Sequence, residues 1–149
     1  MAIELERFID AQDRDFDRAL AELNAGAKRT HWIWYIFPQL AGLGHSPMAE
    51  MYGLRGVEEA GAYLGDPRLH DRLLAVMNAV RAQRVPLGTL MGSDIDALKL
   101  VSSMTLFRDV ARRAGDEDVR AAADEILEAA KRQGFAECQF TLRALALTV

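Results

Sequence analysis

The chain has 149 residues, of which 50% are hydrophobic and 27% are charged, with a formal net charge of −4 and a pI near 5.4. This length suits one domain that buries about two-thirds of the surface of its unfolded chain. The acidic balance argues against broad nucleic-acid binding, which needs a basic face. The N-terminus MAIELERF lacks an export signal and no run of about 18 apolar residues could span a bilayer, so we expect a cytoplasmic protein without membrane contact.

Hydrophobic residues recur at spacings of three and four over most of the chain, which predicts an all-α fold of about seven short to medium helices in a single compact domain over 1–149. In chain order, the predicted helices lie near 4–10, 13–25, 31–37, 48–54, 57–64, 67–83, 93–115 and 116–132, followed by an apolar segment over 135–149. Residues 85–92 are expected to form a loop with a short turn. Only 138–142 has a pattern that could be a strand.

Capping residues and glycines indicate where these helices begin and end. The candidate N-caps are Asp13, Thr30, Ser46, Asp66 and Ser93. Two of them directly precede a proline, the residue type favoured at the first helical position. The break before Asp13 could be only a kink. Glycines predict a break or an end at Gly26, Gly56, Gly115 and Gly134.

Aromatic residues are concentrated in the stretch 28–39, KRTHWIWYIFPQ. Of the eleven aromatic residues in the chain, four fall within six positions, at Trp32, Trp34, Tyr35 and Phe37. Large rings dominate buried cores, so a core role is the more frequent outcome for such a cluster. The alternative is a pocket, in which the neighbouring cations Lys28 and Arg29 would suit a nucleotide-like ligand.

A second unusual stretch, 96–107 (DALKLVSSMTLF), places Lys99, Ser102 and Ser103 on an otherwise apolar helix. These side chains are three and four residues apart, so they project to one side of the helix, and we expect this side to pack against 31–39. In one interpretation the hydroxyls bond to carbonyls one turn earlier and Lys99 reaches solvent. In the other, the cation and the hydroxyls line an anion or nucleotide pocket.

The segments HWIWYIFPQLAGLG, SPMAEMY and LKLVSSMTLF resemble an uncharacterised bacterial domain-of-unknown-function family, some members of which carry a calpastatin-like label. Its motifs, KRxHWxWxxFPQ and DxxKLxSSMTLF, are long and unusual, and the resemblance covers nearly the whole chain. Inhibitor segments of the calpastatin kind are polar, disordered chains that fold on binding. The periodic hydrophobic pattern here predicts a packed globule instead, so we reject that label.

A more remote similarity is to the NADAR and YbiA-like proteins, through the aromatic–proline motif and a following helix with Glu50 and Tyr52. It implies binding or hydrolysis of a nucleotide-like or ADP-ribose-like molecule, by cleavage of an N-glycosidic bond. Such cleavage needs a carboxylate near the sugar and a proton donor toward the base. Glu50 would be the carboxylate, and His31 would donate the proton or bond a phosphate. The residues expected to bind the ligand are Lys28, Arg29, Trp32, Trp34, Phe37, Gln39, Tyr52, Lys99, Ser102 and Ser103.

No cofactor or metal is expected, because the chain lacks dinucleotide, Walker, nucleophile-elbow and H-E-x-x-H motifs and has three scattered histidines. Among these, His70 is expected at the surface. Cys138 cannot form an internal disulfide and is more often a small buried hydrophobe than a nucleophile. The alternative function is a non-catalytic protein-interaction module that uses the aromatic stretch as its docking surface.

Overall fold

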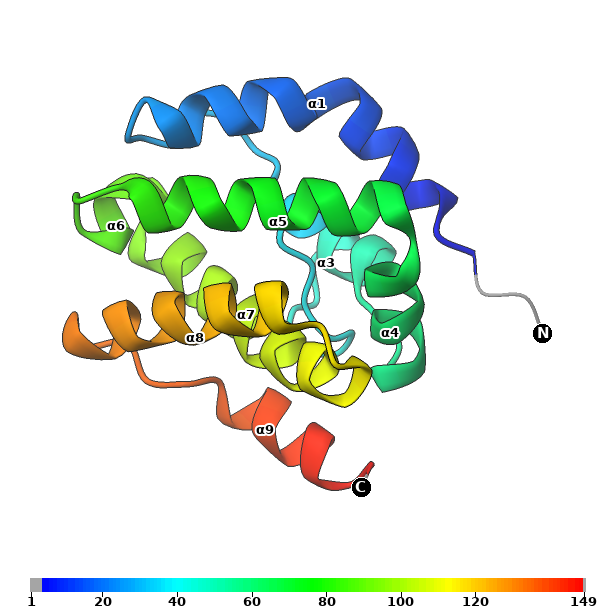
Figure 1. Cartoon of the computed structure of the whole chain (residues 1–149). Coiled ribbons are helices and arrows are strands. Elements are labelled where there is room, and N and C mark those ends of the chain that lie inside the picture. The colour runs from blue at the N-terminus through cyan, green and yellow to red at the C-terminus, as the bar shows by residue number, and fades with distance from the viewer. Residues whose placement is uncertain (1–3, 149) are drawn as a thin grey trace.

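Nine helices form within residues 4–148, the part of the chain that the computed structural model describes. In chain order they are α1 (Glu6–Asn24), α2 (Ile33–Ile36), α3 (Pro47–Tyr52), α4 (Val57–Gly65), α5 (Pro67–Ala82), α6 (Leu87–Leu90), α7 (Asp94–Ala114), α8 (Glu117–Arg132) and α9 (Gln139–Ala146) (Figure 1). These residues contain no strand, only an isolated bridge between Leu40 and Leu54. The predicted all-α class is confirmed, with two helices more than the seven expected.

Most helix boundaries follow from local capping, as the sequence predicts. The side chains of Ser46, Asp66 and Ser93 each accept a hydrogen bond from a backbone N–H two or three residues later, at the starts of α3, α5 and α7. Gly115 ends α7 with φ of 73°, a left-handed conformation that favours glycine. Gly56, with φ of 121°, separates α3 from α4. The predicted caps and breaks at these positions are confirmed.

Three other predicted features are wrong. α1 is continuous from Glu6 to Asn24, because its apolar face continues past Asp13, which is exposed and pairs with Arg72 at 2.7 Å. Thr30 does not cap α2, since its hydroxyl donates to Glu22 at 2.7 Å and the helix begins only at Ile33. The segment 138–142 is not a strand but the start of α9.

α7 is the central helix. Residues 100–107 are buried without interruption, so more than two turns of α7 are enclosed on all sides, as expected for a helix that is apolar around its circumference. α8 packs along α7, and α2, α4, α6 and α9 also contact it. α5 packs against α8 and against α1, so that α1 and α9 lie at opposite ends of the molecule (Figure 1). None of the described helices is long and apolar enough to cross a membrane.

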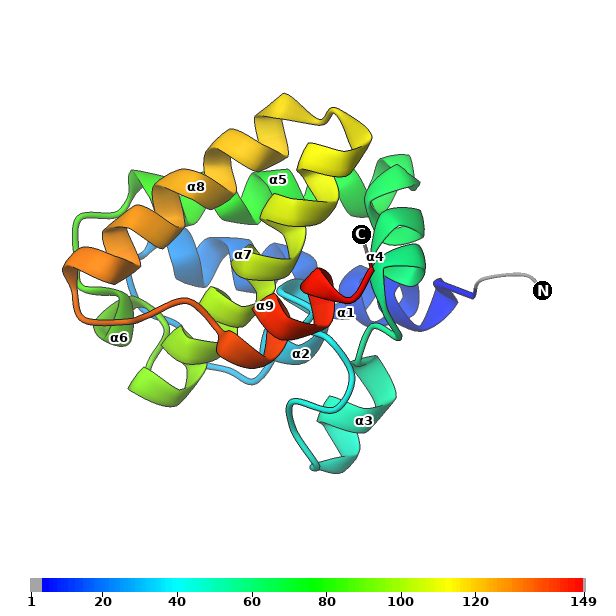
Figure 2. The same cartoon turned by 90° about the horizontal axis from the view of Figure 1, so that it is seen from below.

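Residues 40–54, called here the α3 loop, project from the helical body (Figure 2). The base of the loop is closed by two hydrogen bonds, from Ala41 N to Leu54 O and from Leu54 N to Gln39 O, both 2.8 Å. Gly53 allows this closure, because a Cβ atom at this position would lie 2.7 Å from Cα of Ala41. The α3 loop is thereby held beside α2, which carries the aromatic stretch.

Candidate functional site

One carboxylate at the end of α1 anchors the aromatic stretch. Glu22 accepts hydrogen bonds from the backbone N–H groups of Arg29 (2.8 Å) and Thr30 (3.0 Å). It also accepts from the Thr30 hydroxyl (2.7 Å) and from Nε1 of Trp32 (2.9 Å). Burial alone would raise the pKa of Glu22, but these hydrogen bonds outweigh burial and lower the pKa to about 2. Sequence reasoning missed Glu22, because an acid in an amphipathic helix has no distinguishing pattern.

Two of the predicted ligand-binding rings belong to the core. Trp32 and Phe37 are both 0% exposed, and their ring centroids lie 6.3 Å apart. A fully enclosed ring has no face available for stacking on a base. We therefore assign Trp32 and Phe37 to the core, which is the more frequent outcome for an aromatic cluster.

Asp96 lies between two lysines, each of which lies over a tryptophan ring. Lys28 Nζ is 2.9 Å from Asp96 Oδ2 and 5.1 Å from the centroid of Trp32. Lys99 Nζ is 3.7 Å from Asp96 Oδ1 and 5.3 Å from the centroid of Trp34. The side chain of Lys28 is 5% exposed, whereas that of Lys99 is 29% exposed. Lys28 is thus committed to an internal ion pair, while the ammonium of Lys99 is accessible to an anion.

The expected packing of 31–39 against 96–107 is confirmed, because α2 contacts α7 and Lys99 lies over Trp34. Two buried side-chain polar atoms in these stretches are unpaired among the described residues. They are Nε1 of Trp34 and Oγ of Ser103. By contrast, the hydroxyls of Ser102 and Thr105 donate to carbonyls one turn earlier, at 3.1 and 2.8 Å.

Unpaired buried polar atoms are uncommon and cost about 1–3 kcal/mol each, so they demand an explanation. Both atoms belong to residues that the sequence predicts to bind a ligand. Trp34 is the more accessible of the two, since it is half-buried, whereas Ser103 is fully enclosed in the core. Trp34 and Lys99 therefore form the centre of the candidate site.

A small cavity of about 10 Å³ lies beside Trp34, between α2 and the α3 loop. Its lining residues are Trp34, Gln39, Leu40, Gly44, Ala49, Tyr52 and Gly53. The structure thus brings together Trp34, Gln39 and Tyr52, three residues that the sequence predicted to bind a ligand. The volume is about that of a single water molecule, so a larger ligand requires the α3 loop to move.

Three other predicted residues lie at the surface. Arg29, His31 and Glu50 are exposed, and none of them lines the cavity beside Trp34. Arg29 contributes its backbone N–H to Glu22, and the carbonyl of His31 accepts a hydrogen bond from Tyr35 at 3.3 Å. The side-chain roles of His31 and Glu50 in bond cleavage stay predictions.

Two further side chains differ from expectation. His70 is half-buried rather than at the surface, and its Nε2 lies 2.7 Å from Oδ2 of Asp116, which links α5 to the start of α8. Cys138 is half-buried rather than enclosed, and its sulfur accepts a hydrogen bond from the Thr141 hydroxyl at 3.2 Å. A polar partner explains both positions: Asp116 on the next helix holds His70 away from solvent, and the Thr141 hydroxyl bonds to the thiol of Cys138.

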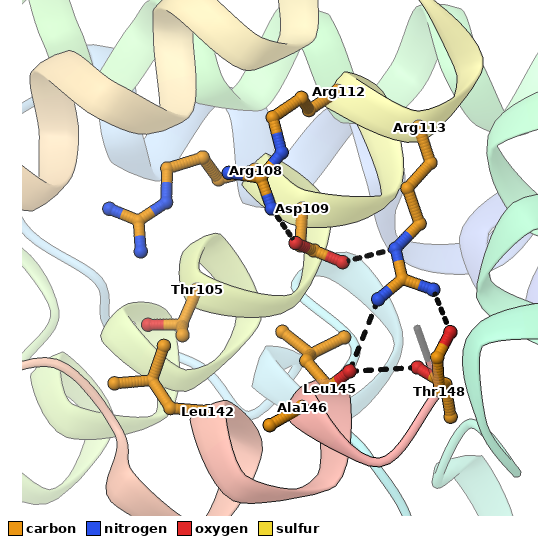
Figure 3. Close-up of a pocket in the computed structure, with 9 residues that line it drawn as sticks. All are labelled: Thr105, Arg108, Asp109, Arg112, Arg113, Leu142, Leu145, Ala146 and Thr148. Carbon is orange, nitrogen blue, oxygen red and sulfur yellow. Dashed lines mark hydrogen bonds and ion pairs between the residues drawn. The ribbon is translucent and has the colours of Figure 1, made fainter.

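A larger cavity, of about 560 Å³, lies between α7 and α9. It is lined by Thr105, Arg108, Asp109, Arg112, Arg113, Leu142, Leu145, Ala146 and Thr148 (Figure 3). No sequence pattern marks this cavity, because arginines in the last turns of a helix usually form a solvated face. A cavity exists here only because α9 folds back over that face.

Comparison with known proteins shows the family but no activity. The family described as "Protein of unknown function (DUF1810)" matches residues 2–135. A crystal structure of the conserved hypothetical protein Rv1873 from Mycobacterium tuberculosis is similar, with 36% identity, 97% of each chain covered and a TM-score of 0.79. No curated protein matches, and neither the calpastatin-like label nor the NADAR similarity is shown by these matches. The chain belongs to the DUF1810 family of proteins of unknown function.

Proposed function

We propose that the protein binds a small molecule of the nucleotide-like or ADP-ribose-like kind, which joins a flat polar ring to an anionic group, at Trp34 and Lys99. The observation that carries the proposal is the unpaired Nε1 of Trp34 beside an accessible cation. A buried N–H donor without a partner gains a full hydrogen bond when a ligand supplies an acceptor. The matching anion would pair with Lys99, whose carboxylate partner Asp96 lies 3.7 Å away.

The ring of the ligand would contact the part of Trp34 that lines the small cavity. Because this cavity holds only about 10 Å³, binding requires displacement of part of the α3 loop. The C-terminal side of the loop is anchored, since Arg7 donates to the carbonyls of Met51 (2.9 Å) and Gly53 (3.3 Å). The part that can move is therefore residues 42–45, which are exposed or half-buried and lie between the closed base of the loop and the Ser46 cap.

The proposal concerns binding. Hydrolysis of an N-glycosidic bond by Glu50 and His31 stays a prediction, since both side chains are exposed and lie outside the cavity. A carboxylate that assists glycosidic cleavage acts in an enclosed site beside the sugar. Such a site would form at Glu50 only if closure of the α3 loop over a bound ligand enclosed this residue.

The alternative, an interaction module that docks through the aromatic stretch, is less well supported. Trp32 and Phe37 are fully buried and Tyr35 is 4% exposed. Trp34 alone among the four rings of the stretch is half-buried. A docking surface requires a contiguous exposed apolar patch, which these rings do not form.

The test is a ligand titration of matched variants. Thermal unfolding is measured with AMP, ADP-ribose and riboflavin phosphate, since a ligand that binds only the folded state raises the melting temperature. We expect at least one of these compounds to stabilise the wild-type protein. Lys99→Gln should weaken its binding by at least about tenfold, which corresponds to 1.4 kcal/mol. Lys131→Gln, an exposed lysine on α8, is the control and should bind like the wild type.

Trp34→Phe tests the contribution of the unpaired donor apart from that of the ring. This variant keeps an aromatic surface but removes Nε1, so we expect weaker binding with little change in stability. The proposal is wrong if none of the three compounds stabilises the wild-type protein, or if Lys99→Gln and Trp34→Phe both bind the stabilising compound as tightly as the wild type.

A further inference from the structure

The cavity between α7 and α9 has the size of a small-molecule site, because such sites occupy about 300–1,000 Å³ and this one measures about 560 Å³. Three guanidinium groups and one carboxylate are its ionisable lining groups, so the lining carries a net charge of about +2 near neutral pH. The charged groups come from α7, and the apolar groups Leu142, Leu145 and Ala146 come from α9 (Figure 3). The cavity is therefore cationic on one side and apolar on the other.

Arg113 serves to hold α9 in place. Its Nε lies 2.6 Å from Oδ2 of Asp109, and its terminal nitrogens donate to the carbonyls of Thr148 (2.8 Å) and Leu145 (3.2 Å). Figure 3 shows this guanidinium between Asp109 and the end of α9. All three of its nitrogens thus have partners, which leaves it little capacity for a ligand.

Arg112 has more of its guanidinium available. It pairs with Oδ1 of Asp109, but its side chain is 65% exposed. Because Asp109 is shared between Arg112 and Arg113, one carboxylate balances two cations. Arg108, one turn earlier on α7, pairs with Glu137 and lies 3.9 Å from Asp124. The uncompensated positive charge of the cavity is accordingly centred on Arg112.

We infer that this cavity is a second binding site, separate from Trp34, for a small molecule that carries a phosphate or carboxylate group on an apolar body. The planar guanidinium of Arg112 binds such an oxyanion through two parallel N–H···O hydrogen bonds. The apolar body lies on Leu142, Leu145 and Ala146. A phosphate and a carboxylate present the same pair of acceptor oxygens to a guanidinium. Titration with one compound of each kind distinguishes the two.

The experiment is isothermal titration calorimetry with phenyl phosphate, benzoate and inorganic phosphate. We expect the wild-type protein to bind phenyl phosphate or benzoate at concentrations below about 10 mM, and inorganic phosphate more weakly because it lacks an apolar body. Arg112→Gln should reduce the affinity by at least about tenfold, and Arg112→Lys should lose part of it, because lysine keeps the charge but not the planar fork.

Matched controls keep the result specific. Arg68→Gln, on α5, removes a side chain of similar exposure (60%) whose aspartate partner is 3.9 Å away, and it should bind like the wild type. Lys99→Gln, which removes the cation of the site at Trp34, should keep the part of the binding that Arg112→Gln removes, and this separates the two sites. The inference is overturned if the wild-type protein binds none of the three anions, or if a folded Arg112→Gln binds them unchanged. Binding that is lost in Lys99→Gln but kept in Arg112→Gln would overturn it while supporting the proposed function.

Discussion

Trp32 and Trp34 are two residues apart in the same aromatic stretch, yet they lie in opposite environments. Trp32 is fully buried and its Nε1 donates to Glu22 at 2.9 Å. Trp34 is half-buried and its Nε1 has no partner within the described chain. The two rings are otherwise alike, since each lies under a lysine that pairs with Asp96. The Nε1 donor of Trp32 thus contributes to the fold, whereas that of Trp34 is left unpaired within the described residues.

Paired and unpaired donors contribute differently to stability. A buried group whose hydrogen bonds are all made loses stability when it is removed, because its partner is left unpaired. A buried donor that makes no hydrogen bond in the free protein carries an uncompensated desolvation cost, so removing that donor should not lower stability. Substitutions at the two tryptophans and at Glu22 test this contrast.

Trp32→Ala should lower the free energy of unfolding by about 3–5 kcal/mol, because it empties a core position and removes a donor to Glu22. Urea unfolding followed by circular dichroism measures the loss. Trp34→Ala, at the half-buried position, serves as the comparison and should lose less. An equal or larger loss in Trp34→Ala would break the contrast between the two rings.

Glu22→Gln should lower the free energy of unfolding by about 2 kcal/mol at pH 7. The amide has one acceptor oxygen and cannot accept all four of the hydrogen bonds that lower the pKa of Glu22 to about 2. This figure allows for partial solvent exposure, which reduces the effect. A carboxyl whose pKa is lower in the folded state adds stability that is present above its unfolded pKa of 4.5 and is lost as the pH falls through about 2. The wild-type protein should therefore lose more stability than Glu22→Gln between pH 5 and 2. Parallel curves for the two proteins over this range would contradict the anchoring role.

His70 supplies a pH dependence in a different range, away from the tryptophans. Burial would lower the pKa of His70, but Asp71 and Asp116 outweigh it and raise the pKa above 6.5. A raised pKa means that this contribution is fully present below 6.5 and is lost as the pH rises through the higher, folded value. The difference in unfolding free energy between the wild-type protein and His70→Gln should shrink above pH 6.5, by less than about 1 kcal/mol in total. A difference that grows with pH would refute the ion pair with Asp116.

Trp34→Phe should change the free energy of unfolding by less than about 1 kcal/mol, since it removes an unpaired donor and keeps an aromatic ring. Trp32→Phe is the matched variant and should cost more, because Glu22 loses one of its donors. Chemical unfolding of both variants under the same conditions provides the measurement. If Trp34→Phe were the more destabilising of the two, Nε1 of Trp34 would have a structural partner and the proposed site would lose its main support.

The parts of the fold that could be predicted from the sequence are those set by local signals. The caps at Ser46, Asp66 and Ser93 act over two or three residues, and the glycine that ends α7 acts at its own position. The predicted cap at Thr30 is wrong because its hydroxyl donates to Glu22 in α1 instead of bonding to the backbone of its own segment. A capping residue is predictable only when no distant partner competes for its side chain.

The sequence by itself determined that the chain is all-helical, and it located the two stretches that meet at the candidate site, because hydrophobic period and an unusual residue composition are readable along the chain. Only the tertiary structure decided which tryptophan is core and which is available, since this depends on Glu22 in α1 and Asp96 in α7. It also decided that α9 packs against α7 beside Arg112 and so forms a cavity. Burial and ion pairing depend on contacts between distant segments, and such contacts have no periodic signature in a single sequence.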